Sequence, residues 1–174
     1  TVKAQFLASG PVDKRWQSIY TMLFAAMGLA TTRIWLETPY FVPDRPLLMV
    51  LQSAALRGVD VRLLLPTQSD HPLVHYAGRS FFDELLQAGC RIFTYNRGML
   101  HAKAVTIDDS FSTIGSTNMD QRSFRLNFEG NLFFFDTEIT CFLQQDFMEV
   151  CKSAREVTYA ERITLPKWER FKES

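Results

Sequence analysis

The sequence has no excess of charge of either sign, few cysteines and no apolar run long enough to cross a membrane. Nineteen Lys and Arg residues balance nineteen Asp and Glu residues, so the formal net charge is zero. Because a broad nucleic-acid-binding surface usually gives a basic excess, we expect no nucleic acid partner, although a local basic cleft stays compatible with this charge. The most apolar run, residues 19–30, is too short to span a bilayer and predicts a helix buried against a sheet.

The lack of paired cysteines and of a signal peptide bears on the cellular compartment of the protein. The three cysteines, Cys90, Cys141 and Cys151, are odd in number and show no C-x-x-C spacing, so we interpret them as buried reduced thiols in a reducing compartment. The sequence starts at Thr1 and shows no signal peptide. We therefore expect a soluble piece of a longer chain, whose membrane anchors, if any, lie outside it.

The apolar pattern of the first half predicts strands and helices in alternation. With 47% hydrophobic residues and 15 phenylalanines, the 174 residues are enough for one domain, 1–174, with a large aromatic core. We expect strands over 2–10, 32–38, 59–66 and 91–96, and helices over 13–31, over 44–58 with Asp44 as N-cap, and up to Gly89. This β-α-β-α-β-α-β order predicts an α/β fold with a largely parallel sheet and helices on both faces.

The second half has a different pattern. Strands are predicted over 101–108, 111–118 and 128–136, with a helix over 137–152 that buries Phe142, Phe147 and Val150. These closely spaced strands make the central sheet mixed. Residues 155–174 form a charged tail, in which Trp168 and Phe171 are possible anchors.

The segment 101–118 combines polar groups that are poor occupants of a buried strand. Side chains alternate along a strand, so His101 and Lys103 share one face. If residues 109–110 form a two-residue hairpin loop, Asn118 lies opposite His101 and Ser116 lies opposite Lys103. An imidazole, an ammonium, a hydroxyl and a carboxamide are then expected on one patch.

These groups suit the chemistry of a phosphodiester. Lys103 provides a positive charge for the non-bridging oxygens, and Ser116 and Asn118 add hydrogen bonds without charge. His101 can attack phosphorus or deliver a proton, and Glu129 on the next strand could reach the imidazole and fix its tautomer. No histidine–carboxylate cluster suggests a metal, so we expect no metal or other cofactor and electrostatic stabilisation by side chains alone.

Neighbouring residues support this interpretation in part. Gly115 lets a ligand or a backbone segment approach closely, and Glu129 and Asn131 alternate onto one face of their strand. Taken singly, a His–Lys pair is usually an edge-strand surface pair, and Asp108 is usually a turn residue. The combined pattern H-x-K-x4-D, followed after six residues by G-S-x-N, has a chance occurrence of roughly one in a million from average composition.

For several other residues the sequence supports both a functional and a purely structural interpretation. His71 and His75 have the i, i+4 spacing of a metal pair, but a loop beside the cleft is the better interpretation. Tyr40 and Phe41 follow the carboxyl end of a strand, where ligands bind in α/β sheets, so they either line a lipid or headgroup pocket or pack a loop. The arginines after the G-S-x-N stretch either attract anionic headgroups or form a solvated helix face; they are Arg122 and Arg125.

The motif H-x-K-x4-D over 101–108, with G-S-x-N over 115–118, resembles that of the phospholipase D superfamily. Residues 5–136 look like the C-terminal half of the bacterial cardiolipin synthases, through the stretches TPYFVPD, AALRGVDVRLLLP, LLQAGCRIFTYNRGMLHAK and GSTNMDQRSFRLNFEGN. The resemblance implies a phospholipase D-like α-β-α sandwich in which two such motifs meet at one site. It also implies transfer of a phosphatidyl group between two phosphatidylglycerol molecules through a phosphohistidine, giving cardiolipin and glycerol.

The resemblance also implies roles for individual residues. His101 is the histidine of the C-terminal motif, by family analogy more often the general acid and base than the nucleophile. Lys103, Ser116 and Asn118 bind phosphate, and Glu129 orients an imidazole. Asp108 belongs to the motif, and we interpret it as a structural member that ties the hairpin together.

The sequence departs from the full enzymes in having one H-x-K motif. The chain is then half of a site, completed by the N-terminal half of the same enzyme or by a second copy of this chain. We expect the full-length protein at the bacterial inner membrane, acting on anionic phospholipid at the membrane surface. The alternatives are a lipid hydrolase or homodimeric nuclease of the same superfamily, and a catalytically silent half kept for dimerisation or lipid binding.

Overall fold

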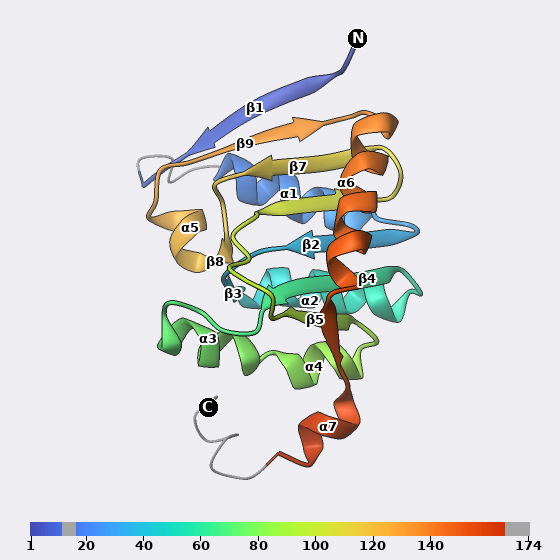
Figure 1. Cartoon of the computed structure of the whole chain (residues 1–174). Helices are drawn as coiled ribbons and strands as arrows, with labels where there is room; N and C mark the ends of the chain where they lie inside the picture. The colour runs from blue at the N-terminus through green and yellow to red at the C-terminus, as the bar shows by residue number, and fades with distance from the viewer. Residues whose placement is uncertain (12–16, 166–174) are drawn as a thin grey trace.

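A mixed eight-stranded sheet runs through the centre of the computed structural model, which describes residues 1–11 and 17–165 (Figure 1). Two pairs of neighbouring strands are parallel and five are antiparallel among these residues, so antiparallel pairing is more extensive than predicted. The strands, in spatial order, are β1 (Ala4–Ser9), β9 (Glu129–Phe134), β7 (Phe111–Gly115), β6 (Ala104–Ile107), β2 (Arg33–Glu37), β4 (Asp60–Pro66), β5 (Arg91–Tyr95) and β10 (Ala154–Val157).

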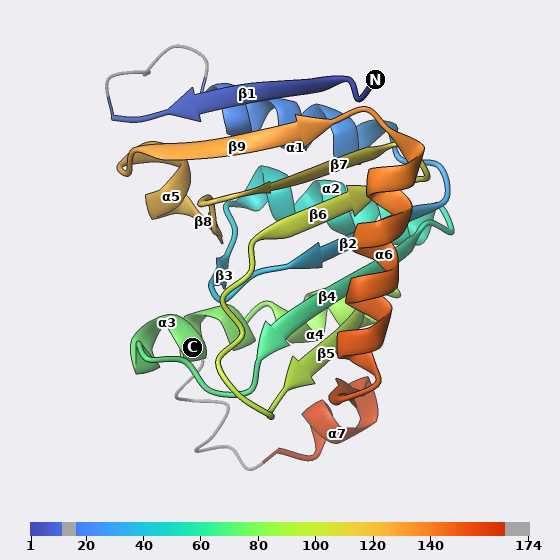
Figure 2. The same cartoon turned by 45° about the horizontal axis from the view of Figure 1, so that its top comes forward.

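Helices cover both faces of this sheet. The helices α1 (Ser18–Leu29), α2 (Arg45–Leu56) and α4 (Phe82–Gln87) lie on one face, and α6 (Thr137–Cys151) crosses the other (Figures 1 and 2). This is the predicted α-β-α sandwich, and the prediction of an α/β fold with a mixed sheet is confirmed. Within the described part of the eight-stranded sheet, parallel pairing is confined to β2, β4 and β5, where strands and helices alternate along the chain.

Strand β2 shows why the central strands are apolar on both faces. Ile34 and Leu36 are buried in the core formed with α1 and α2. Trp35 points to the opposite face and stacks on Phe147 of α6, with ring centroids 5.4 Å apart. A strand that is covered on both faces has a continuous apolar sequence, as residues 34–36 do.

Capping side chains fix where the helices begin. Asp44 accepts a hydrogen bond from the backbone amide of Leu47 at 3.1 Å and caps α2, as predicted. Asp136 caps α6 in the same way, through the amides of Glu138 and Ile139. The two central helices are therefore anchored at their N-termini by local sequence.

Several elements differ from the sequence prediction. The helix expected to end at Gly89 is two helices, α3 (Pro72–Arg79) and α4. The loop after β2 contains β3 (Phe41–Val42), which pairs in parallel with β8 (Met119–Asp120) ahead of the short helix α5 (Gln121–Arg125). Phe142 is 68% exposed, so its predicted burial was wrong, whereas Phe147 is buried.

The predicted tail contains regular structure. Residues Ala154–Val157 pair with β5 as the last strand of the sheet, and α7 (Tyr159–Ile163) follows. Trp168 and Phe171 lie outside the described residues. Within residues 1–11 and 17–165, the helices are all too short or too polar to cross a bilayer.

Candidate active site

His101 and Lys103 lie in the segment that leads into β6, just outside the strand itself. The Lys103 ammonium donates a hydrogen bond to the His101 carbonyl oxygen at 2.8 Å. It also lies 3.3 Å from Nδ1 and 3.4 Å from Nε2 of the His101 ring. The two groups that the motif was expected to bring together are therefore in contact.

The predicted hairpin register was wrong by one residue. Ile107 pairs with Phe111, so the loop between β6 and β7 has three residues, 108–110, rather than two. The extra residue is Asp108, whose φ of 50° is left-handed. Lys103 consequently lies opposite Gly115, whose amide bonds to the Lys103 carbonyl at 3.2 Å. Ser116 and Asn118 are not opposite the motif residues.

Asp108 lies at the far end of β6 from Lys103, about 16 Å along an extended chain. Its carboxylate accepts hydrogen bonds from the backbone amides of Thr31, Thr32 and Arg33, at 3.0, 2.8 and 3.1 Å, and from both threonine hydroxyls. Partial burial alone would raise the pKa of this carboxyl, but the hydrogen bonds outweigh it and lower the pKa to about 2. Asp108 thus ties the β6–β7 turn to the start of β2.

Ser116 and Glu129 form a second pair. The Ser116 hydroxyl donates to the Glu129 carboxylate and accepts a hydrogen bond from the Gly130 amide at 3.0 Å. Asn127 Nδ2 donates to the same carboxylate at 3.1 Å. The buried Glu129 carboxylate therefore accepts hydrogen bonds from Ser116 and Asn127 and not from the His101 imidazole. Its proposed role in orienting an imidazole stays a prediction.

Electrostatics connect the two pairs. Burial lowers the pKa of the Lys103 ammonium, and the negative charge of Glu129 acts in the opposite direction. The lysine is therefore a partly desolvated cation beside a carboxylate and an imidazole. Such a cation interacts more strongly with phosphate oxygens than a fully hydrated one does.

Asn118 faces a different cavity from His101. His101 and Lys103 border an open hollow of about 610 Å³, together with Phe6, Ile114 and Leu132. A separate cavity of about 460 Å³, which shares no lining residue with the first, contains Asn118. The predicted group of four side chains is thus brought together only in part.

A buried amide network that the sequence analysis did not identify holds the G-S-x-N segment on β9. Asn131 Oδ1 accepts hydrogen bonds from the amide and hydroxyl of Thr117, at 3.3 and 2.7 Å. Its Nδ2 donates to the hydroxyl of Thr113 at 3.2 Å. The alternation of Glu129 and Asn131 on one strand face was the available signal, and both residues do bond to residues 116–117.

The aromatic and histidine residues near the cavities have different positions. Phe41 is buried in the core, whereas the Tyr40 hydroxyl donates to Asp70 Oδ1 at 2.6 Å. His71 lines the 460 Å³ cavity beside Tyr40, and His75 lines another, smaller cavity. Across the described residues, His, Cys, Asp and Glu side chains form no group of three or more that could hold a metal ion.

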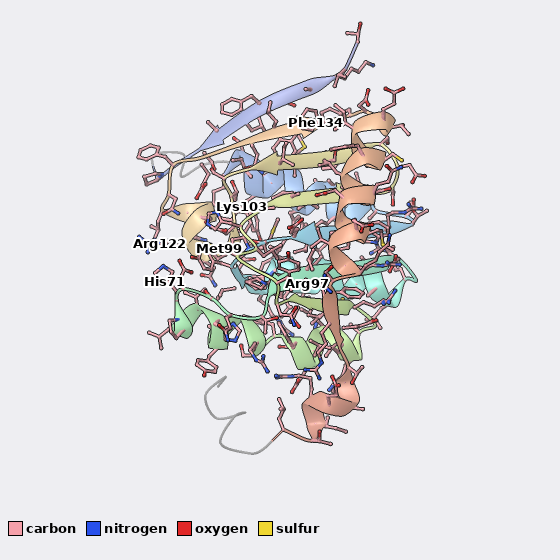
Figure 3. All side chains as sticks on the ribbon, viewed as in Figure 1. His71, Arg97, Met99, Lys103, Arg122 and Phe134 are labelled. Carbon is pink, nitrogen blue, oxygen red and sulfur yellow. The ribbon has the colours of Figure 1, made fainter. Side chains whose placement is uncertain are left out.

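The two arginines of α5 also differ. Arg125 pairs with Asp44 at 3.3 Å, away from both cavities. Arg122 lines the 460 Å³ cavity, and Figure 3 shows it on the same side of the molecule as His71. From the sequence alone, these two arginines had the same interpretations.

Comparison with known proteins supports the motif. A family model described as cardiolipin synthase, PLD-like domain, matches residues 23–151. Cardiolipin synthase 2 of Bacillus anthracis is 46% identical over 153 residues, which are 88% of this chain and 30% of that protein. Major cardiolipin synthase ClsA of Bacillus subtilis (strain 168) is 40% identical over 173 residues, 99% of this chain and 36% of that protein. The chain spans about a third of the length of these relatives.

Solved structures share the fold at low sequence identity. The phospholipase D family member Nuc from Salmonella typhimurium superposes with a TM-score of 0.76 and 16% identity, covering 91% of this chain and 99% of that chain. Phosphatidylserine synthase from Haemophilus influenzae gives 0.75 and 15%, covering 98% and 44%. Since the family model matches more than half of the chain, the protein belongs to the family of cardiolipin synthase, phospholipase D-like domains.

Proposed function

We propose that this chain is the C-terminal catalytic half of a cardiolipin synthase-type phosphatidyltransferase, which converts two phosphatidylglycerol molecules to cardiolipin and glycerol. The observation that carries the proposal is the Lys103 ammonium against the His101 imidazole at an open hollow of about 610 Å³. The 40–46% identity to cardiolipin synthases supports the choice of phospholipid over other phosphodiesters.

The reaction divides into two displacements at phosphorus. First, a histidine nitrogen attacks the donor phosphodiester; a P–N bond forms, the P–O bond to glycerol breaks, and the leaving oxygen takes a proton from the other histidine. Second, a hydroxyl of the acceptor lipid gives its proton to that histidine and attacks phosphorus, and the P–N bond breaks. Lys103 holds the non-bridging oxygens in both steps. By family analogy, His101 is the proton donor and acceptor.

The second histidine motif comes from the N-terminal half of the longer protein or from a second copy. The His101 side chain is exposed, and the apolar residues around its hollow are uncovered, with Phe6 64% exposed. A partner half that covers this face would enclose the reacting phosphorus and exclude water. The relatives' greater length supports an additional domain in the same chain. We propose that the complete protein acts at the bacterial inner membrane, where its lipid substrate lies.

The test is His101→Ala in the full-length protein, with phosphatidylglycerol vesicles as substrate. We expect cardiolipin formation to fall roughly 10²–10⁴-fold, the contribution of a positioned general acid and base, with an unchanged thermal unfolding midpoint because the side chain is exposed. His75→Ala, which removes the same side chain from a different cavity, is the matched control and should retain activity.

Three outcomes would contradict the proposal. Normal cardiolipin synthesis by His101→Ala would overturn the catalytic assignment. Release of phosphatidic acid by the wild-type protein without cardiolipin would indicate a lipid hydrolase, and hydrolysis of DNA instead of lipid would indicate a nuclease.

A further inference from the structure

The 460 Å³ cavity lies between α3 and the β8–α5 segment and has two unlike walls. Leu73, Val74 and Ala77 of α3 form an apolar wall. Asn118 and Arg122 belong to the opposite, polar wall. A cavity of this size with one apolar and one polar side fits an amphipathic molecule.

Arg122 gives the polar wall a positive charge. Its exposed guanidinium has no hydrogen bond or ion pair with the described residues, in contrast to Arg125 three residues later, which pairs with Asp44. The carboxylate of Asp120 also borders the cavity, but it is buried and caps α5 through the Ser123 amide at 2.7 Å. The unpaired guanidinium is therefore available to an anion, for which its fork of N–H donors is well suited.

Asn118 adds a hydrogen-bond acceptor whose orientation follows from its neighbours. The Ser123 hydroxyl donates to Asp120 Oδ2 at 3.3 Å, so it can only accept from Asn118, whose Nδ2 lies 3.2 Å away. The Asn118 Oδ1 atom is left buried without a hydrogen-bond partner among the described residues. An unsatisfied buried acceptor destabilises the folded chain, so a hydroxyl that enters the cavity and donates to it is favoured.

The position of Asn118 connects this cavity to the proposed reaction site. It lies three residues after Gly115, which lines the hollow of that site, so their Cα atoms are within about 11 Å of each other. A ligand held by Arg122 and Asn118 is thus next to, but outside, the hollow that His101 and Lys103 border.

We propose that this cavity binds the acceptor of the transfer reaction, an anionic phosphodiester that carries free hydroxyls, as in the headgroup of the second phosphatidylglycerol. Arg122 binds its phosphate, Asn118 Oδ1 accepts a hydrogen bond from one hydroxyl, and the α3 wall contacts its apolar part. Arg122 is then a specificity residue for the lipid acceptor, with no part in the attack on the donor. This inference rests on the proposed function, since it assigns the second substrate of that reaction.

The test distinguishes binding of the lipid acceptor from the displacement steps that transfer to any alcohol requires. In the full-length protein, cardiolipin formation requires a phosphatidylglycerol acceptor, whereas incorporation of labelled free glycerol into phosphatidylglycerol requires the donor and both histidines only. We expect Arg122→Gln to lower cardiolipin formation about 10–100-fold, the effect of losing one charge-assisted hydrogen bond, and to change glycerol exchange less than about twofold. Deacylated glycerophosphoglycerol, offered as a soluble acceptor, should show the same dependence on Arg122 if Arg122 binds the headgroup.

Two variants serve as controls. Arg122→Lys keeps the charge and should recover part of the cardiolipin synthesis. Arg125→Gln removes the same charge from the same helix outside the cavity and should leave both reactions unchanged.

The outcomes are distinguishable. Equal loss of both reactions in Arg122→Gln would assign Arg122 to the donor or to the fold, and no loss of either would leave the cavity without a role; both results overturn the acceptor site. A wild-type protein that neither makes cardiolipin nor exchanges glycerol would refute the proposed function, and the acceptor site with it.

Discussion

Asp108 shows how a motif residue can act on a distant segment rather than on its own neighbours. Its carboxylate accepts hydrogen bonds from three consecutive amides, those of residues 31–33, which precede it by more than 70 positions. Its backbone is left-handed, a conformation that Asp tolerates better than most residues. The sequence indicates a turn at Asp108, but the carboxylate's partners are recognisable only after folding.

Asp108→Asn should destabilise the protein in a pH-dependent way. The folded-state pKa of about 2 lies below the ordinary value of 3.8, so the ionised carboxylate adds stability that is complete above pH 4 and is lost as pH falls towards 2. At pH 7 we expect the variant to lose roughly 1–2 kcal/mol in free energy of unfolding, after allowance for solvent screening of a half-buried group.

Urea unfolding at pH 7 and at pH 2 measures this difference. The gap between wild-type and variant should close at the lower pH. Asp109→Asn, which removes only an exposed ion pair at 3.5 Å to Arg33, should cost less than about 0.5 kcal/mol at either pH. A gap that stays constant with pH would show that the carboxylate's charge is not what stabilises the turn.

At the scale of elements, close contact between β7 and β9 determines the residue at position 115. A Cβ atom on Gly115 would overlap with Asn131 Oδ1 and with the Gly130 carbonyl oxygen. From the sequence, a glycine here predicts close approach by a ligand or a backbone segment. Strand β9 is the segment that comes close to Gly115, because its residue Asn131 must reach Thr117 to hold the G-S-x-N segment.

Gly115→Ala should therefore shift β9 and destabilise the sheet by roughly 1–3 kcal/mol, the usual cost of overpacking. The thermal unfolding midpoint measures the change. Gly28→Ala in α1 is the matched control: its Cβ would meet only Val50 at 3.8 Å, so higher helix propensity should leave stability unchanged or raise it. Equal midpoints for Gly115→Ala and wild-type would mean that β9 does not constrain this position.

At the scale of the whole molecule, one histidine motif is insufficient for the proposed chemistry. The attacking and leaving atoms of an in-line displacement lie on opposite sides of phosphorus, so one imidazole cannot serve both. The described chain supplies His101 at a hollow that is open on its apolar side. In the proposed mechanism, the site is complete only when a second histidine faces it.

The isolated 174-residue chain should accordingly be nearly inactive as a monomer. Sedimentation at increasing concentration, with cardiolipin formation measured in parallel, tests this directly. Activity should stay below about 1% of the full-length rate unless a dimer forms, and should then rise with the dimer fraction. Turnover by a chain that sediments as a monomer at every concentration would contradict the shared site.

Local sequence patterns were sufficient to predict the order and type of most elements and to identify the motif. Apolar runs located β2, β4 and β5, and Asp44 located the start of α2, because these signals depend on residues a few positions apart. The pair of His101 and Lys103 was also predictable, since two residues along an extended chain bring their side chains to one side.

The hairpin register, the exposure of Phe142 and the cavity that contains Arg122 arise from contacts that form only in the folded chain. The register depends on hydrogen bonds between Asp108 and residues 31–33, and the cavity requires α3 to lie beside α5, far apart in the chain. Long-range contacts of this kind leave no periodic trace in the sequence, because each partner satisfies its own local pattern without the other.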